Sequence, residues 1–360
     1  GVNIMHDKNY LFYPYTDKSY SFVKGLIASN INFDVISPIG YGLNGKDLSY
    51  VTNRMKLKKT IKDIHNIDFS QYNSILLSNN INELMLDELE VIATSAGEHK
   101  IEIVNLSGEF NLDTLDFRIQ NEVDDIESEI KEMMNRIEEF GLAYYKSQKP
   151  IILVGGILES IDDFSISLGL KLEFEKQGYK TQLITDEKDA IFFNCIKYPA
   201  SFMSNKVSAE IQIWTLNRFI QAIETLKNPD IIIVHIPEGM IHYNNYFDNA
   251  FGSYAFIIGQ SLQADYFILN LVNSIVDDRY LKQLDEYFKV ILGKEIDLFN
   301  LTNSYYEEPI DRVEKLDHPL YLDETEINQI VNFYKGKYNL KNLNNPEEIQ
   351  RTINDIIQKF

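Results

Sequence analysis

Apolar residues recur along the first hundred residues in short runs that are separated by amphipathic stretches. The runs predict strands and the stretches between them predict helices: strands at Tyr10–Tyr13, Phe33–Ser37, Tyr72–Leu77 and Lys100–Leu106, and helices at Ser19–Ser29 and Glu83–Ala96. Strands that alternate with helices in this way indicate a parallel sheet with helices on its faces. We therefore expect a Rossmann-like domain over residues 1–108.

A second series of apolar runs begins after Pro150. Its members predict five strands: Ile151–Val154, Thr181–Thr185, Ile231–Ile236, Tyr266–Leu271 and Asp297–Leu301. The spacing between them again suits crossover helices, so we expect an α/β domain over residues 150–305.

The segment Phe164–Phe174 carries two conflicting signals. Apolar and polar residues alternate strictly along it, and this period of two is typical of a strand. The distance from Val154 to Thr181 suits a strand–helix–strand crossover, which needs a helix, and Gly178 stands where a helix C-terminal cap belongs. We predict a helix with two apolar stripes, buried on both sides.

Residues Glu122–Tyr145 show the most regular helical periodicity of the chain. Their apolar positions alternate spacings of three and four residues: Val123, Ile126, Ile130, Met133, Ile137, Phe140 and Tyr144. The pattern predicts a long amphipathic helix inside a linker of residues 109–149. Its apolar seam packs on the protein's own domains or pairs with a partner, and we favour the first because three heptads are short for an independent coiled coil.

The remaining residues, 306–360, predict a helical C-terminal extension with helices at Asp323–Tyr334 and Pro346–Lys359. The expected fold class is therefore α/β. It consists of two Rossmann-like or P-loop-like parallel-sheet domains, which a long amphipathic helix joins and the helical extension follows.

Composition narrows the class of partner. The 360 residues carry a formal net charge of −20, which argues against binding nucleic acid or an anionic membrane. Cys195 is the single cysteine, so no internal disulfide forms. We take it as a small buried hydrophobic residue rather than a nucleophile. No apolar run reaches the length of a membrane span, and we expect a cytoplasmic protein.

The segment Lys149–Phe164 (KPIILVGGILESIDDF) has the shape of a phosphate-binding loop without its chemistry. A working P-loop needs a lysine for the β- and γ-phosphates and a hydroxyl for Mg²⁺. Here the matching positions hold Ile161, Asp162 and Asp163, with Glu159 upstream, and these carboxylates would repel a triphosphate. The loop thus predicts a P-loop scaffold that has lost its NTPase role.

The glycines at 40, 42 and 45 form a second, weaker motif. They match G-x-G-x-x-G within Pro38–Asp47, but no acidic residue closes a following strand at the distance expected of a dinucleotide site. A tight loop at the carboxyl end of a strand is the preferred interpretation.

Three segments of the second domain reach the carboxyl edge of its predicted sheet, where ligands bind in such folds. They bring candidate carboxylate and imidazole groups to one edge: Glu159, Asp162, Asp163, His235, Glu238, His242 and Asp248. Such groups suit a divalent metal, or acid–base catalysis by Glu238 with His242. Their spacing is not diagnostic of a metal site, and His235 inside an apolar strand reads more simply as a core histidine. No serine-hydrolase or zinc-protease pattern is present.

The third of these segments, Tyr243–Tyr254, is rich in aromatic residues and asparagine. Aromatic side chains bury a large area at low entropic cost, so interfaces favour them. We predict that four rings bind a partner: Tyr243, Tyr246, Phe247 and Phe251. The alternative is that Phe247 and Phe251, four residues apart, form the core face of a helix.

At these residues the sequence resembles the clostridial peptide maturation system proteins. The resemblance covers about residues 10–305 and is carried by six segments: Tyr13–Asp17, Ser37–Asp47, Ile152–Gly156, Gly178–Lys180, Pro229–Gly239 and Asn244–Gly252. Such proteins occur beside radical-SAM enzymes that modify ribosomally made peptides. More remotely, the second domain is similar to P-loop NTPases of the dethiobiotin-synthetase type.

The resemblance implies a non-catalytic accessory protein that acts with a peptide-modifying enzyme, a precursor peptide or both, and no resident cofactor is expected. One alternative is an enzyme that uses the carboxylate and histidine groups, with or without a divalent metal. Another is a binder of a nucleotide fragment through the backbone amides of Gly155 and Gly156, because a helix N-terminus attracts anions. The oligomeric state is left open, a homodimer included.

Overall fold

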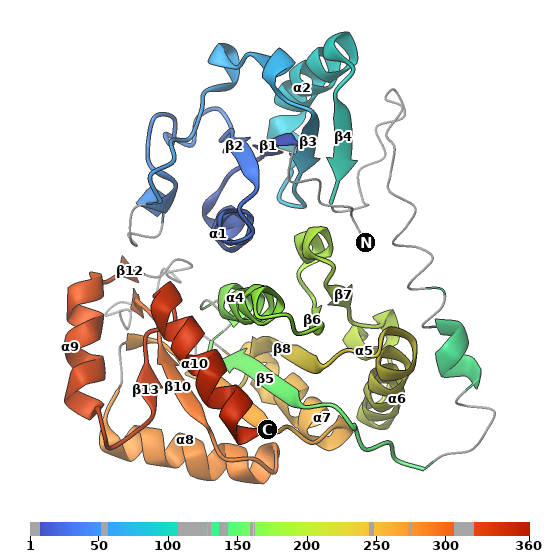
Figure 1. Cartoon of the computed structure of the whole chain (residues 1–360), viewed down its shortest axis with the longest axis vertical. Helices are drawn as coiled ribbons and strands as arrows, with labels where there is room; N and C mark the ends of the chain where they lie inside the picture. Colours follow the sequence, from blue (N-terminus) through green and yellow to red (C-terminus); the bar gives the residue numbers. More distant parts are fainter. Residues whose placement is uncertain are drawn as a thin grey trace. The chain divides into compact units, whose positions relative to one another are not determined.

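The structure is a computed structural model. It describes residues 8–51, 57–106, 128, 131–136, 143–158, 161, 163–244, 248–273, 276–305 and 320–360. The backbone contacts divide the chain into two compact units, of which the first comprises Gly1–Asp124 with Glu187–Asn194 and the second Asp125–Asp186 with Cys195–Phe360. The fold class is the predicted one, α/β with parallel sheets in both units (Figure 1).

The first unit contains a four-stranded parallel sheet in the order β2-β1-β3-β4. Its elements lie close to the predicted ranges: β1 Asn9–Tyr13, α1 Tyr20–Ala28, β2 Asn32–Val35, β3 Ser74–Leu77, α2 Leu86–His99 and β4 Glu102–Asn105. The side chains of Leu11, Ile75 and Leu89 form part of a continuous core. Every residue of β3 and nearly every residue of β1 is buried, and the burial of their apolar side chains stabilises these strands.

A short segment from the middle of the chain completes this first unit. The 3-10 helix η6 (Lys188–Phe193) places Asp189 so that its carboxylate accepts hydrogen bonds from Ser78 Oγ at 2.6 Å and Asn79 N at 3.1 Å. Phe192 stacks edge-on against Tyr10, with ring centroids 5.7 Å apart. The carboxyl end of β3 is therefore occupied by a side chain of the protein itself.

The second unit contains a seven-stranded parallel sheet in the order β13-β10-β9-β5-β8-β6-β7. The strands are β5 Ile151–Gly156, β6 Thr181–Thr185, β7 Ile196–Lys197, β8 Ile231–Gly239, β9 Tyr266–Leu271, β10 Leu298–Leu301 and β13 Leu340–Lys341. The small strands β11 Ser304–Tyr305 and β12 Leu320–Tyr321 form a separate antiparallel pair. The central strand β5 is buried along its whole length.

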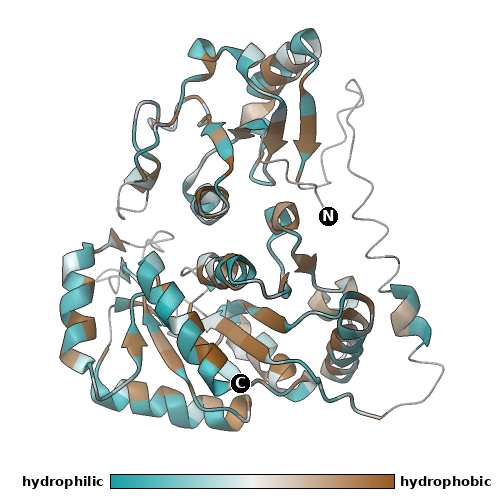
Figure 2. Cartoon of the chain, in the orientation of Figure 1, coloured by the Kyte–Doolittle hydropathy of each residue, from teal (hydrophilic) through white to brown (hydrophobic). Residues whose placement is uncertain are grey.

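Helices cover both faces of this second sheet. They are α4 Asp163–Lys176, α5 Ala200–Met203, α6 Ala209–Lys227, α7 Ser253–Ser261, α8 Asp278–Ile291, α9 Glu324–Tyr334 and α10 Pro346–Lys359. Helices α4 and α10 lie on one face, and α7 and α8 lie on the other (Figure 1). Figure 2 shows apolar residues concentrated along the strands and polar residues on α8, α9 and α10. Among the described residues, no helix has both the length and the apolar character to span a bilayer.

The prediction of a helix over Phe164–Phe174 is confirmed, since these residues form most of α4. Phe164, Leu168 and Phe174 are all buried, so burial on most sides explains the alternation that resembled a strand. Gly178 follows the helix with a φ of +91°, a left-handed conformation that glycine adopts without steric cost.

Most of the predicted linker helix Glu122–Tyr145 lies outside the described residues. Residues 128 and 131–136 are helical, whereas 143–145 are not, so the predicted end near Tyr145 is too late. Met133 packs against the core of the second unit, in the way that the prediction of intramolecular packing requires.

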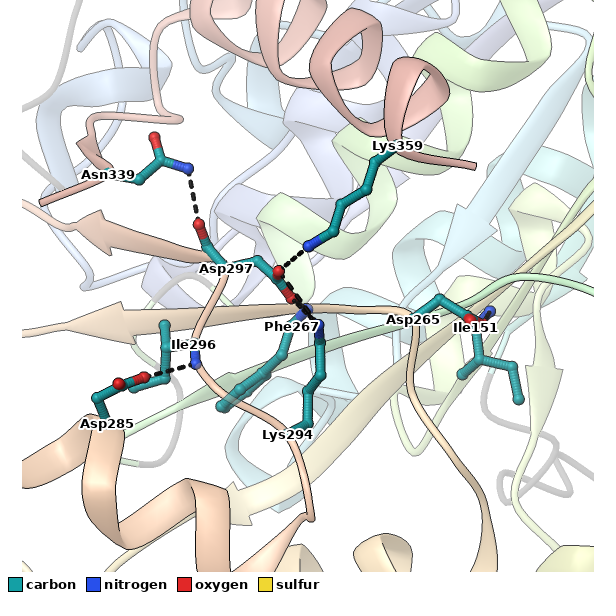
Figure 3. A network of polar contacts seen from close by, with 9 residues as sticks. All are labelled: Ile151, Asp265, Phe267, Asp285, Lys294, Ile296, Asp297, Asn339 and Lys359. Carbon is teal, nitrogen blue, oxygen red and sulfur yellow. Dashed lines mark hydrogen bonds and ion pairs between the residues drawn. The ribbon is translucent and has the colours of Figure 1, made fainter.

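The C-terminal residues are more than a surface extension, because β13 joins the edge of the sheet beside β10. Asp297, directly before β10, ties these parts together (Figure 3). Its carboxylate accepts a hydrogen bond from Phe267 N at 2.8 Å and forms ion pairs with Lys294 and with Lys359 of α10. Its backbone carbonyl accepts from Asn339 Nδ2 at 2.7 Å.

Asp297 belongs to a repeated arrangement at the amino edge of the sheet. Asp265, before β9, accepts from Ile151 N at 2.8 Å, and Asp230, before β8, accepts from Lys180 N at 2.8 Å. In each case an aspartate that precedes one strand receives the backbone N–H at the start of a neighbouring strand. These carboxylates satisfy backbone donors at the sheet edge and fix the register of adjacent strands.

We predict that Asp297→Asn lowers the free energy of unfolding by about 1–3 kcal/mol, because it removes the charge from an almost buried acceptor and leaves two lysines without their partner. Asp355→Asn is the matched control. Asp355 pairs with Lys341 but is 58% exposed, so its loss should change stability by less than about 0.5 kcal/mol. Urea denaturation measures both, and equal midpoints for the two variants would contradict the role given to Asp297.

Candidate functional site

The loop that resembles a P-loop is filled by the protein's own side chains. Gly155 and Gly156 belong to β5 and pair with Leu269 and Asn270 of β9. A Cβ atom at Gly155 would lie 2.4 Å from Met240 Sδ, and one at Gly156 would lie 2.7 Å from Ile161 Cγ1. The two glycines therefore admit side chains of the core at positions where a nucleotide-binding domain would admit phosphate.

The residues after these glycines that the structure describes are apolar and buried. Ile157, Leu158 and Ile161 each have an exposed fraction of 1% or less and belong to the main core cluster of the second unit. The amide of Ile157 donates to the carbonyl of Asn270 at 3.0 Å. The described part of this loop is therefore packed into the core, and the cofactor-binding role of Gly155 and Gly156 stays a prediction.

A charged cluster lies beside this filled loop, at the carboxyl edge of the sheet. His235 of β8 is buried between two aspartates: its Nε2 lies 3.3 Å from Asp163 Oδ2 at the start of α4, and its Nδ1 lies 3.3 Å from Asp186 Oδ1 just after β6. Thr185 Oγ1 lies 2.9 Å from Nδ1, and Tyr198 donates to the His235 carbonyl at 2.8 Å. The cluster thus connects strands β6 and β8 with the start of helix α4.

The two aspartates keep His235 charged. Burial by itself would lower the pKa of His235, but the carboxylates of Asp163 and Asp186 outweigh it and raise the pKa to about 10. Burial likewise opposes ionisation of Asp186, but the hydrogen bond and charge of His235 lower the pKa of its carboxyl group. An imidazolium therefore occupies this edge at neutral pH, flanked by carboxylates.

The cluster leaves one ring nitrogen of His235 without a hydrogen bond, and one of its carboxylates is accessible to solvent. His235 Nε2 is buried without an aligned hydrogen-bond acceptor, although Asp163 is within ion-pair distance. The side chain of Asp186 is 35% exposed, whereas those of Asp163 and His235 are almost fully buried. Solvent thus reaches the cluster at Asp186.

Of the other predicted site residues, His242 and Asp248 have contacts outside this cluster. Glu238 has a φ of +60° near the end of β8, and His242 stacks on the ring of Phe251 at 5.3 Å. Asp248 accepts from Ala250 N at 3.3 Å. Glu159 and Asp162 lie outside the described residues. Within the described ranges, no group of three or more His, Cys, Asp or Glu side chains is placed to hold a metal ion.

Asp186 was not predicted, although the sequence contains its signal. It follows the strand Thr181–Thr185 directly, so it lies at the carboxyl edge that the prediction already considered. Cys195 is buried, and burial raises the pKa of its thiol to about 12, which keeps the thiol protonated and unreactive.

The aromatic segment after β8 is held in a strained conformation. Asn249, Ala250 and Phe251 have φ values of +50°, +47° and +56°, in the left-handed region that costs non-glycine residues about 1 kcal/mol or more each. The side chain of Asn249 holds the segment down by donating to the carbonyls of Ile157 at 2.9 Å and Ile241 at 2.6 Å. A Cβ at Gly239 would lie 2.2 Å from Asn249 Cγ, so only glycine fits beneath it.

This strained turn presents Phe251 to solvent, where it is 71% exposed. The alternative prediction, which placed Phe251 on the core face of a helix, is therefore wrong for this residue. Tyr243 is half-buried and packs against the core of the second unit. Tyr246 and Phe247 lie outside the described residues. Of the two predicted partner-binding rings that the structure describes, Phe251 is the more exposed.

No protein-family model matches the chain, and no curated protein matches it. Among solved structures it is similar to a DUF1611 family protein from Anabaena variabilis, with a TM-score of 0.56 and 10% identity over 98% of this chain and 100% of that one. Signal recognition particle 54 kDa protein from Aeropyrum pernix, in complex with GDP, has a TM-score of 0.29 and 13% identity over 77% and 63% of the two chains. The first likeness shows the fold alone, and the second is too weak to carry an argument.

The raised pKa of His235 gives its charge a defined effect on stability. Because the pKa in the folded state is about 10 and that of an unfolded histidine about 6.5, the stabilisation is complete below pH 6.5 and is lost as the pH rises to 10. We predict that the difference in unfolding free energy between the wild type and His235→Gln is largest below pH 6.5 and shrinks toward pH 10.

Denaturation curves across this pH range, with NMR titration of the His235 ring, test the prediction. Asp163→Asn should lower the pKa of His235, because it removes one of the two flanking charges. A ring that loses its proton near pH 6.5 in the wild type would show that the aspartates do not hold the charge.

Proposed function

We propose that this protein is a non-catalytic accessory protein in the maturation of a ribosomally made peptide, and that it acts in the cytoplasm beside a peptide-modifying enzyme of the radical-SAM type. The observation that carries the non-catalytic part is the filled loop, in which Met240 and Ile161 take the space at Gly155 and Gly156. The peptide-maturation part depends on the resemblance of the six segments described above.

The surface of the second unit supports a binding role. Four consecutive residues, Asn249–Gly252, adopt left-handed conformations, and the buried Asn249 side chain fixes them. Backbone strain of this kind persists where the surrounding structure enforces it, and such places are often sites of binding. The strain here holds an exposed phenylalanine in one orientation, which lowers the entropy that a partner would have to remove.

The alternative is an enzyme, and the charged cluster is the observation that favours it. Asp163, His235 and Asp186 meet at the edge where α/β proteins carry their active sites. A histidine with a pKa near 10 is a poor base at neutral pH, and its side chain is buried. We therefore favour a structural role for the cluster, in which the imidazolium neutralises the aspartate at the N-terminus of α4.

We predict that the purified protein neither hydrolyses ATP or GTP with Mg²⁺ nor gains thermal stability from them. A ligand at 100 times its Kd would add about 2.7 kcal/mol to the stability, which is several degrees in Tm for most domains. Differential scanning fluorimetry at millimolar nucleotide measures this, with an active P-loop NTPase as positive control. A rise in Tm of several degrees would contradict the proposal that this loop no longer binds a nucleotide.

We further predict that Phe251→Ala weakens association with the proposed peptide-modifying enzyme or precursor peptide by at least about 1–2 kcal/mol, the size of a modest hot spot. Phe333→Ala is the matched control, because Phe333 is 80% exposed on α9, a different surface of the same unit. Pull-down from co-expression, with a melting curve for each variant, separates lost binding from lost folding. Equal binding by the two variants would contradict the role of Phe251.

A further inference from the structure

The sheet of the first unit changes its winding direction between β1 and β3. In the order β2-β1-β3-β4, the chain leaves β1 through α1 toward one side and leaves β3 through α2 toward the other. Phe12 of β1 stacks on Phe22 of α1 at 4.9 Å, whereas Leu11 shares a core cluster with Leu89 of α2, so the two helices cover opposite faces. In α/β sheets, ligands bind beyond the carboxyl ends of the strands at such a switch point.

A carboxylate of the chain itself occupies this switch point. Asp189 accepts one hydrogen bond at each oxygen: its Oδ2 from Ser78 Oγ at 2.6 Å and its Oδ1 from Asn79 N at 3.1 Å. Ser78 directly follows β3, and its backbone N–H donates to the carbonyl of Tyr13, the last residue of β1, at 2.9 Å. The carboxylate therefore lies where both strands end.

The loop after β3 holds the two donors in place. Asn80 Nδ2 donates to Ser78 Oγ at 3.1 Å, so the hydroxyl proton of Ser78 is directed toward Asp189. A hydroxyl and a backbone amide that donate to the two oxygens of one planar group suit a carboxylate. Both donors are neutral, and the chain has a net charge of −20, which favours a singly charged carboxylate over a doubly charged phosphate.

The carboxylate reaches these donors from a distant segment. Ser78 and Asp189 are 111 residues apart, and Asp189 belongs to η6, which lies between β6 and β7 in the sequence. The contact of Asp68 is local by comparison, although its donors are alike: Asp68 accepts from Ser70 Oγ at 2.6 Å and from Ser70 N at 3.1 Å. At Ser78 and Asn79 the internal carboxylate thus takes the place that a separate ligand would take.

We propose that the switch point of the first unit is a binding site for a carboxylate group, and that Asp189 closes it as an internal competitor. The ligand is an acidic side chain of a peptide or the C-terminus of a chain, because both present the same pair of oxygens to Ser78 and Asn79. An external carboxylate binds when the carboxylate of Asp189 leaves these donors, so the contact is autoinhibitory.

Removal of the internal carboxylate tests the proposal. Full-length wild type, Asp189→Ala and Asp68→Ala are titrated with sodium acetate, with sodium chloride at the same ionic strength as reference, and the amide chemical shift of Asn79 and the Tm report binding. We expect acetate to bind Asp189→Ala at least about tenfold more tightly than the wild type, because no hydrogen bond to a charged group has to be broken first. Asp68→Ala is the matched control, since it frees the same kinds of donor, and it should behave as the wild type does.

Two further variants keep the result decisive. Asp189→Asn removes the charge and keeps the shape, so it replaces Asp189→Ala if that variant does not fold, and acetate should raise its Tm as well. Ser78→Ala, added to either variant of Asp189, should weaken acetate binding about tenfold, because one of the two donors is lost.

Two peptide probes identify the source of the carboxylate. Tighter binding of N-acetyl-aspartate amide to Asp189→Ala indicates an acidic side chain as the ligand, and tighter binding of N-acetyl-glycine indicates a C-terminus. The proposal is overturned if neither variant of Asp189 binds acetate, if the wild type binds it equally tightly, or if the binding survives Ser78→Ala unchanged.

Discussion

The second unit depends on the close packing at Gly155 and Gly156. These two residues lack side chains, and Met240 and Ile161 fill the space beside the central strand. A P-loop keeps this space for phosphate, and its open loop surrounds an anion. Here the same turn belongs to the hydrophobic core, with Ile157 and Leu158 almost fully buried. Ile161, two residues before α4, also lies in this core.

A charged cluster lies next to this packing. The N-terminus of α4 carries a partial positive charge, which favours an aspartate such as Asp163. A buried carboxylate needs a counter-ion, and His235 on the neighbouring strand provides it at 3.3 Å. Asp186 then balances the imidazolium from the other side. The alternation of charges thus accounts for the contacts of the cluster.

The sequence predicted the long strands and helices well, but it did not predict short elements that depend on contacts with distant residues. Long apolar runs such as Ile231–Ile236 define strands because both faces of a parallel sheet are buried. The two-residue strand β13 has no such pattern, since only its neighbour β10 holds it in the sheet. The assignment of Glu187–Asn194 to the first unit depends on specific contacts of Asp189 and Phe192, which no periodicity reveals. Of the candidate site residues, Asp163 and His235 meet, whereas His242 packs on Phe251 instead.

The direction of the parallel strands determines which helix ends lie at each edge of the second sheet. In a doubly wound domain, helix N-termini gather at the carboxyl edge of the strands and favour anions there. Helix carboxyl termini gather at the amino edge, where Asp230, Asp265 and Asp297 accept the backbone N–H groups at the start of neighbouring strands. At the carboxyl edge, methionine and isoleucine side chains fill the space beside the two glycines of the central strand.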